Sequence, residues 1–229
     1  GQLSQGNQNR AYFVLIALSR LETDVAAEAL LDALAASTPH LRQAALEGLV
    51  NMRAHPLISG TAGIARIAAA TRDASTEVRI VACAALGQIA APHDLTAIAA
   101  LSEQLNADRD VRWNAALALA RLRSERGTPL MLSMLDRGYW TSDANQVEYV
   151  TPKGDAVRRP FSDRQIRDYL MAAIDAAAGL TDPAVRTAIS KLQSDPSMAV
   201  RDRAIKAVKT VSNEPRAMVR MRSVPGESV

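Results

Sequence analysis

Arginine is the residue whose spacing along this chain most plainly suggests chemistry. An apolar residue followed by arginine, with Ala or Leu four positions and Leu, Ile or Val eight positions after the apolar residue, recurs five times, at Arg42, Arg79, Arg112, Arg167 and Arg201. A row of guanidinium groups can bind anions, or each arginine can pair with a carboxylate or carbonyl of a neighbouring segment. We favour pairing over an anion-binding ladder. The acidic residues expected as partners are Asp73, Asp108 and Asp163.

Other reactive side chains do not form a recognisable catalytic pattern. His40, His55 and His93 each neighbour a proline, and none stands at helical i, i+4 spacing from another metal-ligating residue. Cys83 lies at a mostly apolar helix position and is expected in the core. We recognise neither a nucleophile elbow nor a Gly-rich phosphate loop. The sequence therefore predicts a protein that is not an enzyme, with no cofactor and no metal.

Each arginine stands on an amphipathic helix. Ala or Leu follows the apolar anchor residue by four positions, and Leu, Ile or Val follows it by eight, so the three share one face. Successive anchors lie 37, 33, 55 and 34 residues apart, and a weaker copy stands at Asn9–Arg10. Partner helices are expected between the anchors, each opened by a capping residue. Their expected ranges are 25–36, 62–71, 95–105, 130–137 and 184–193.

The long interval contains an insertion, residues 138–160, within the fourth repeat. Two short extended runs flank a turn at Pro152–Gly154, which predicts a small β-hairpin. We expect the repeat region to span residues 1–212. Residues 213–229 are expected to form a short terminal helix or a disordered tail.

The repeat resembles a known family. The segments 76–87 and 108–119 are similar to the HEAT-like repeats of phycobilisome lyases, whose second helix reads roughly Asp-x-x-Val-Arg-x-x-Ala-Ala-x-Ala-Leu-Gly. The resemblance implies an all-α fold, a right-handed α-α superhelix (solenoid) of about five HEAT-like helical hairpins with one small inserted hairpin. It implies little about activity, because such repeats serve many functions.

Composition narrows the remaining classes. The net charge is +3, and only 3% of the residues are aromatic. One cysteine excludes an internal disulfide, and no apolar run reaches the length of a membrane span. The chain opens at Gly1, so we expect a processed form or a piece of a longer protein. The cytoplasm is slightly favoured, and an exported form whose signal peptide was removed is the alternative.

The second helices should present a surface opposite the core, two, six and nine positions after each anchor. This surface is apolar in the second and third repeats, acidic in the fourth and basic in the fifth. Either the insertion folds back over Trp113, or the apolar patch is open to a partner. The predicted partner-binding residues are Ile80, Trp113, Leu117, Tyr139, Trp140, Tyr149, Asp168, Asp175, Lys206 and Lys209.

The sequence therefore predicts a protein-interaction scaffold that binds a peptide or partner helix on its concave face and insertion. Two rivals are nucleic-acid binding, as in alkylpurine glycosylases, and an accessory or chaperone subunit of a lyase-type complex. Nucleic-acid binding requires a basic concave groove, whereas the basic residues here gather near the C-terminus. The identity of the partner and the oligomeric state stay open.

Overall fold

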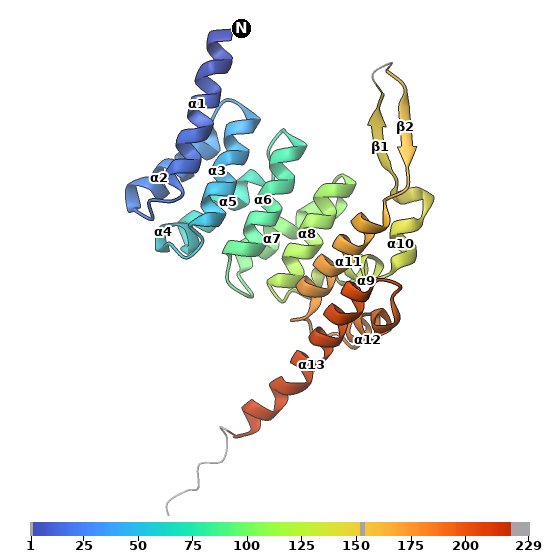
Figure 1. Ribbon diagram of the computed structural model, residues 1–229. Coiled ribbons are helices and arrows are strands. Elements are labelled where there is room, and N and C mark those ends of the chain that lie inside the picture. Colours follow the sequence, from blue (N-terminus) through green and yellow to red (C-terminus); the bar gives the residue numbers. More distant parts are fainter. Residues whose placement is uncertain (1, 152–153, 221–229) are drawn as a thin grey trace, which may run out of the picture. The chain divides into compact units, whose positions relative to one another are not determined.

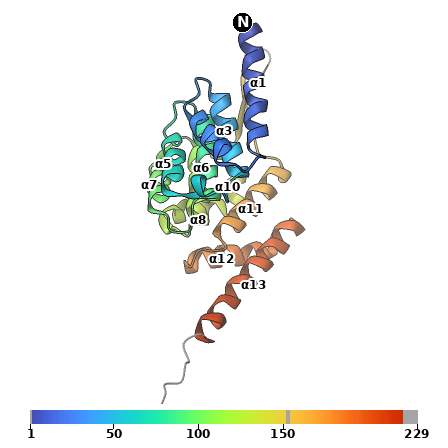
Figure 2. The same ribbon diagram turned by 90° about the vertical axis from the view of Figure 1, so that its left-hand side faces the viewer.

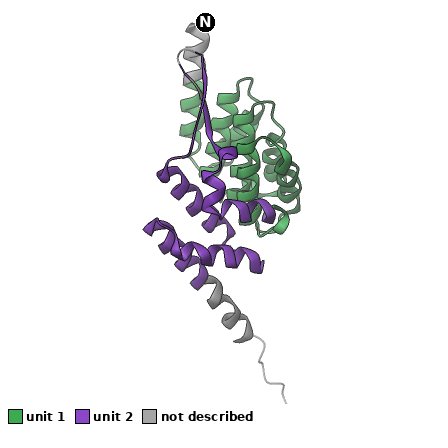
Figure 3. Ribbon diagram, turned by 90° about the vertical axis from the view of Figure 1, so that its right-hand side faces the viewer, with its two compact units in different colours: residues 1–127 green, residues 128–229 purple. Residues whose placement is uncertain are grey.

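The computed structural model describes the backbone of residues 2–151 and 154–220 and the side chains of residues 10–148, 151 and 154–209. Helices make up most of it (Figure 1). The chain divides into two compact units, residues 1–127 and 128–229 (Figure 3). The predicted all-α, helical-repeat fold is confirmed.

Unit 1 consists of a first helix followed by three helical hairpins. α1 (Gln2–Leu18) precedes the pairs α2 (Asp24–Asp32) and α3 (Pro39–Asn51), α5 (Thr61–Ala70) and α6 (Thr76–Ile89), and α7 (Leu95–Glu103) and α8 (Arg109–Arg121). A short helix α4 (Pro56–Ser59) and the 3-10 turns η1 (Ala33–Ala35), η2 (Gln104–Asn106) and η3 (Glu125–Gly127) connect them. α3, α6 and α8 pack side by side in one layer, and α5 and α7 lie in the other (Figure 2).

The core of unit 1 is built from the stripes that the repeat predicts. On α6, Val78, Ala82 and Leu86 are all completely buried. The equivalent residues of α3 and α8 that are also completely buried are Ala45, Leu49, Val111, Ala115 and Leu119. Because α6 packs against both neighbouring helices of its layer, each repeat shelters the apolar face of the next.

Small residues allow α6 and α8 to approach closely. A Cβ added to Gly87 would lie 2.7 Å from both Cα and Cβ of Ala118, well inside van der Waals contact. The helix surfaces therefore touch through backbone atoms at this point.

Side-chain caps begin most of the helices. Ser75, Asp94 and Asp182 accept hydrogen bonds from first-turn N–H groups of α6, α7 and α12, as their positions predict. The helix expected over residues 25–36 begins one residue earlier, at Asp24, because Thr23 accepts the hydrogen bond from Ala26 N. Asp24 is the first residue of α2, where its negative charge interacts favourably with the helix dipole.

Unit 2 contains two further hairpins and the insertion. Its elements are α9 (Thr128–Met134), α10 (Arg137–Thr141), η4 (Asp143–Asn145), β1 (Val147–Val150), β2 (Ala156–Arg159), α11 (Asp163–Ala177), α12 (Pro183–Lys191), η5 (Leu192–Ser194) and α13 (Met198–Arg220). α9 and α12 contact each other, and α11 packs against α13. The predicted β-hairpin is confirmed, since β1 and β2 pair antiparallel with Val147 opposite Arg159. Gly154 supplies the positive φ of its turn.

The predicted helix over residues 130–137 is too long, because α9 ends at Met134. In a continuing helix, the carbonyl of Met134 would accept the N–H of Gly138. Instead the Asp136 carboxylate accepts that N–H at 2.9 Å, and the Trp140 indole donates to the Met134 carbonyl at 2.9 Å. The Asp136 side chain thus binds the donor, and the Trp140 side chain binds the acceptor, of a backbone hydrogen bond that a longer α9 would make. Asp136 also caps the next helix, α10.

The C-terminal segment is helical over its described part. α13 continues to Arg220, and residues 221–229 of the expected tail lie outside the described residues. Within the described part of the chain, none of the helices combines the length and apolarity that crossing a membrane requires.

Candidate protein-binding surfaces

Two of the three repeated arginines of unit 1, Arg42 and Arg79, bind an acidic residue of the following repeat. Arg42 makes two hydrogen bonds to Asp73, at 2.6 and 2.7 Å, with only 15% and 11% of the two side chains exposed. This hydrogen bond holds the pKa of Asp73 below its ordinary value. Arg79 makes a single contact of 3.0 Å with the more exposed Asp108. For these two arginines the predicted pairing is confirmed.

Unit 2 contains a similar pair that the sequence analysis did not find. Arg137 makes two hydrogen bonds of 2.8 Å to Asp195, and the aspartate side chain is only 2% exposed. Burial acts to raise the pKa of Asp195, but hydrogen bonds from Arg137 and from Ser197 N outweigh it, so the pKa is lowered. Because both carboxylate oxygens are satisfied, this buried charge is well compensated.

A sequence signal for Asp195 does exist. Asp73 and Asp195 each stand six residues before an anchor arginine and two before a serine, and that serine's N–H binds the aspartate in both cases. The identity of the partner could not be read from spacing. The anchor Arg167 binds its neighbour Asp168 instead, and the expected Asp163 lies 3.9 Å from Arg137. Arg112 has its Nε buried without a hydrogen-bond partner.

The predicted apolar patch of unit 1 is partly accessible. Ile80 on α6 and Leu117 on α8 are half-buried, and so are Val50 and Ala84 of the same surface on α3 and α6. Trp113 is only 6% exposed, and the guanidinium of Arg109 lies 4.9 Å from its ring centroid. We call the row Gln43, Glu47, Val50, Ile80, Ala84 and Leu117 the unit 1 strip.

The aromatic residues of the insertion have different environments. Trp140 is 1% exposed, and its ring stacks on Tyr169 of α11 at 4.6 Å and meets Phe161 edge-on at 6.1 Å. Tyr139 is half-buried and packs edge-on against Trp140. Tyr149 lies in β1 opposite Val157, and its side chain is outside the described residues. Trp140 therefore anchors the insertion in unit 2.

The charged residues predicted on unit 2 are exposed. Asp168 on α11 accepts hydrogen bonds from Arg167, and Asp175 on the same helix accepts two from Arg203 of α13, at 3.0 and 3.1 Å. Lys206 and Lys209 are exposed on α13. Thus the acidic and basic rows lie on two helices that pack together, and one ion pair already joins them.

The histidines and the cysteine have structural surroundings. The His55 imidazole accepts the Leu57 N–H at the start of α4, and His40 stacks on Tyr12 at 4.7 Å. Cys83 is completely buried, which confirms its predicted core position, and burial raises the pKa of its thiol to about 12. In the part of the chain that the structure describes, no three His, Cys, Asp or Glu residues gather as metal ligands would.

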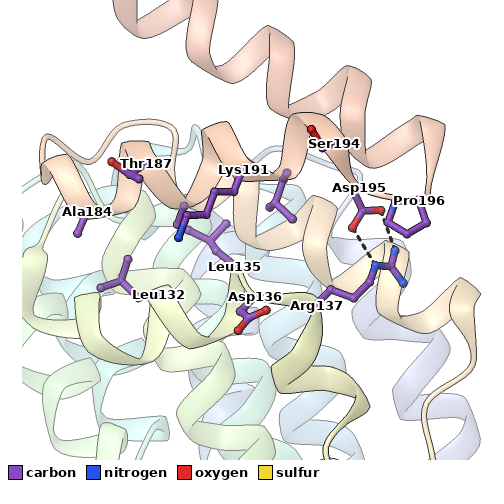
Figure 4. A pocket seen from close by; sticks show the side chains of 12 residues that line it. Leu132, Leu135, Asp136, Arg137, Ala184, Thr187, Lys191, Ser194, Asp195 and Pro196 are labelled. Carbon is purple, nitrogen blue, oxygen red and sulfur yellow. Dashed lines mark hydrogen bonds and ion pairs between the residues drawn. The ribbon is translucent and has the colours of Figure 1, made fainter.

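A groove of about 760 Å³ lies in unit 2 between α9 and α12 (Figure 4). Its apolar lining includes Leu132, Leu135 and Leu192, with Ala184 and Ala188 from α12. The Arg137–Asp195 pair lies at one end of it. Sequence reasoning missed this groove, because it forms where α9 ends early.

A smaller cleft of about 280 Å³ adjoins the groove. It is lined by Arg137, Asp163, Arg164, Arg167, Pro196 and Ser197. Arg137 and Pro196 line both cavities, so the two adjoin at these residues.

Comparison with known proteins places the chain among helical-repeat folds. A family model for HEAT repeats matches residues 64–146. No curated protein sequence matches the chain. A designed armadillo repeat protein, YIII(Dq)4CqI, is similar over 87% of this chain and 92% of its own, with 19% identity and a TM-score of 0.51.

Two other solved structures have the same fold. The complex of CpcE and CpcF of phycocyanin lyase from Nostoc sp. PCC7120 is similar over 82% of this chain and 66% of that chain, with 21% identity and a TM-score of 0.53. An engineered protein, target OR329, covers 91% of both chains, with 17% identity and a TM-score of 0.56. At these identities the likeness extends to the fold and not to the activity.

Proposed function

We propose that this HEAT-like repeat protein is a non-enzymatic scaffold that binds a peptide or helix of a partner protein along the unit 1 strip. The observation that carries the proposal is the row of half-buried apolar side chains on three adjacent helices, α3, α6 and α8. Such a row offers apolar area to a partner, while its polar members can fix the partner's register.

Ile80 and Leu117 are the proposed apolar contacts of the strip. Glu47 at the α3 end is exposed, and we assign it to an electrostatic contact with a basic group of the partner. Trp113 stands one turn before Leu117 on α8, but little of its ring is accessible, so we do not count it among the direct contacts. Burial also makes Trp140 a support of the insertion and not a direct contact. We keep Tyr139, Tyr149, Asp168, Asp175, Lys206 and Lys209 as proposed contacts of a partner that also reaches unit 2.

The similar structures are consistent with a binding role. One of them is a complex of two proteins, CpcE and CpcF. Because that complex belongs to a phycocyanin lyase, an accessory subunit of a lyase-type complex is the alternative function. Ion pairing argues against a nucleic-acid groove, because Arg42, Arg79 and Arg203 are already bound to carboxylates.

Affinity capture with a matched pair of variants tests the proposal. Ile80→Asp with Leu117→Asp places two charges on the strip, and Ala65→Asp with Ala69→Asp places two charges on the exposed side of α5. Proteins captured by the native chain from its source should be lost with the first variant and retained with the second. Both variants should keep the native helix content by circular dichroism. Equal capture by both would contradict the proposal.

A further inference from the structure

The groove between α9 and α12 offers an apolar surface that the helices of unit 2 leave uncovered. Leu132 is half-buried at its edge, whereas Leu135 and Leu192 form its floor with 2% and 6% exposed. Its volume of about 760 Å³ falls in the range, roughly 300–1,000 Å³, of cavities that bind ligands in proteins. Aliphatic side chains fit such a surface better than polar ones.

Several basic side chains around the groove and the adjoining cleft can still donate hydrogen bonds to a bound ligand. Lys191 is exposed at its edge, and no hydrogen bond or ion pair joins it to a described residue. In the adjoining cleft, Arg167 binds Asp168 through Nε and Nη2, which leaves its Nη1. Arg164 is 84% exposed and lies 4.0 Å from Asp168 at its nearest.

Two of the three carboxylates of the two cavities are occupied. Asp195 accepts two hydrogen bonds from Arg137 and one from Ser197 N. Asp136 caps α10 through Gly138 N. The third carboxylate, Asp163, is fully exposed in the cleft and lies 3.9 Å from Arg137 at its nearest. The cleft therefore places three arginines against one exposed carboxylate, so its excess charge is positive and its complement is a carboxylate.

We propose that the groove and the cleft together bind a short segment of a partner protein that carries two aliphatic side chains followed by an acidic residue. The aliphatic side chains lie on Leu132, Leu135 and Leu192. The carboxylate passes the Arg137–Asp195 pair and meets Arg164 and Arg167, and Lys191 attracts it along the edge. This proposal rests on the protein-binding role given above but uses a different surface.

Fluorescence anisotropy with labelled synthetic peptides tests the site on the full chain. The peptides carry two leucines and one glutamate in different orders on a Gly/Ser background. We expect saturable binding of the leucine–leucine–glutamate order. The matched peptide with glutamine in place of glutamate should bind about tenfold more weakly, and the one with serines in place of the leucines should not bind.

Protein variants locate the peptide. Arg164→Glu and Lys191→Glu should each weaken binding about tenfold or more, and Leu132→Asp should abolish it. Arg186→Glu is the control, because it makes the same charge change at an exposed position of α12 outside the groove. Thermal unfolding verifies that each variant is folded.

Three results would overturn the proposal: binding of none of the peptides, equal affinity for the glutamate and glutamine peptides, or equal effects of Lys191→Glu and Arg186→Glu. The variant with charges at Ile80 and Leu117 should bind the peptide normally. Failure at the groove is therefore distinguishable from failure at the unit 1 strip.

Discussion

Replacing Asp73 by alanine should destabilise unit 1 strongly for a single polar substitution. The change removes two hydrogen bonds to Arg42 and the bond from Ser75 N, and it leaves the guanidinium 15% exposed without its carboxylate. Breaking a fully buried pair costs about 3–5 kcal/mol. Because both side chains still reach solvent, we expect a loss of about 2–3 kcal/mol in the free energy of unfolding, between the buried and exposed limits.

The corresponding ion pair of the next repeat, Arg79–Asp108, is the control. Asp108→Ala removes the equivalent partner of Arg79, but Asp108 is 67% exposed and the contact is a single one of 3.0 Å. Its loss should be under about 1 kcal/mol. Urea unfolding followed by circular dichroism measures both variants, and the midpoint should fall by about 1 M for Asp73→Ala. Equal losses would refute the reasoning that burial sets the strength of each pair.

The pH dependence gives an independent check. The folded pKa of Asp73 is lowered, so its stabilisation is complete above the ordinary carboxyl pKa and is lost as the pH falls through the folded value. The difference between native and Asp73→Ala chains should therefore be largest near neutral pH and should shrink in acid. If the two chains differ in stability by the same amount at neutral and at acidic pH, the loss in Asp73→Ala comes from packing and not from the charge of Asp73.

Three further predictions follow from packing. Gly87→Ala should lower the free energy of unfolding of unit 1 by about 1–2 kcal/mol despite the better helix propensity of alanine, because the new Cβ meets the backbone of Ala118 at 2.7 Å. Chemical denaturation measures this loss. A stabilised variant would show that α6 and α8 can move apart. Trp140→Ala should destabilise unit 2 by about 3–5 kcal/mol, whereas Trp140→Phe should lose chiefly the hydrogen bond to Met134 and cost less; thermal unfolding compares the two. Cys83 should react with a thiol reagent only as fast as unit 1 opens, because it is buried and its pKa is raised to about 12; fast labelling of the native chain would contradict this.

The repeat could be predicted because its signal is local. Val78, Ala82 and Leu86 share a helix face by spacing alone, and they are buried as expected. The hairpin of the insertion could be predicted because Gly154 stands at a turn between two extended runs. The end of α9 could not, since it depends on Asp136 and Trp140 competing for backbone groups.

The binding surfaces could be predicted only in part. The Arg137–Asp195 pair joins residues 58 positions apart, and Arg137 is not one of the five repeated arginines, so the repeat spacing does not identify it. The groove has no sequence pattern, because it is a space left by a shortened helix. Trp140 is among the predicted partner-binding residues, and its ring is buried against Tyr169 and Phe161. The sequence alone does not distinguish an aromatic residue that contacts a partner from one that fills the interior.

The way the insertion is held has a practical consequence. Trp140 fixes the chain before the hairpin, Phe161 fixes it after, and Val147 and Arg159 face each other where the two strands begin and end. The two strand ends are thus only about 5 Å apart, the spacing of any antiparallel pair. We therefore expect that a tight turn or a foreign loop can replace the residues between them while the surrounding helices keep their sequence. The hairpin of β1 and β2 is therefore a suitable position for grafting an epitope or a reporter peptide.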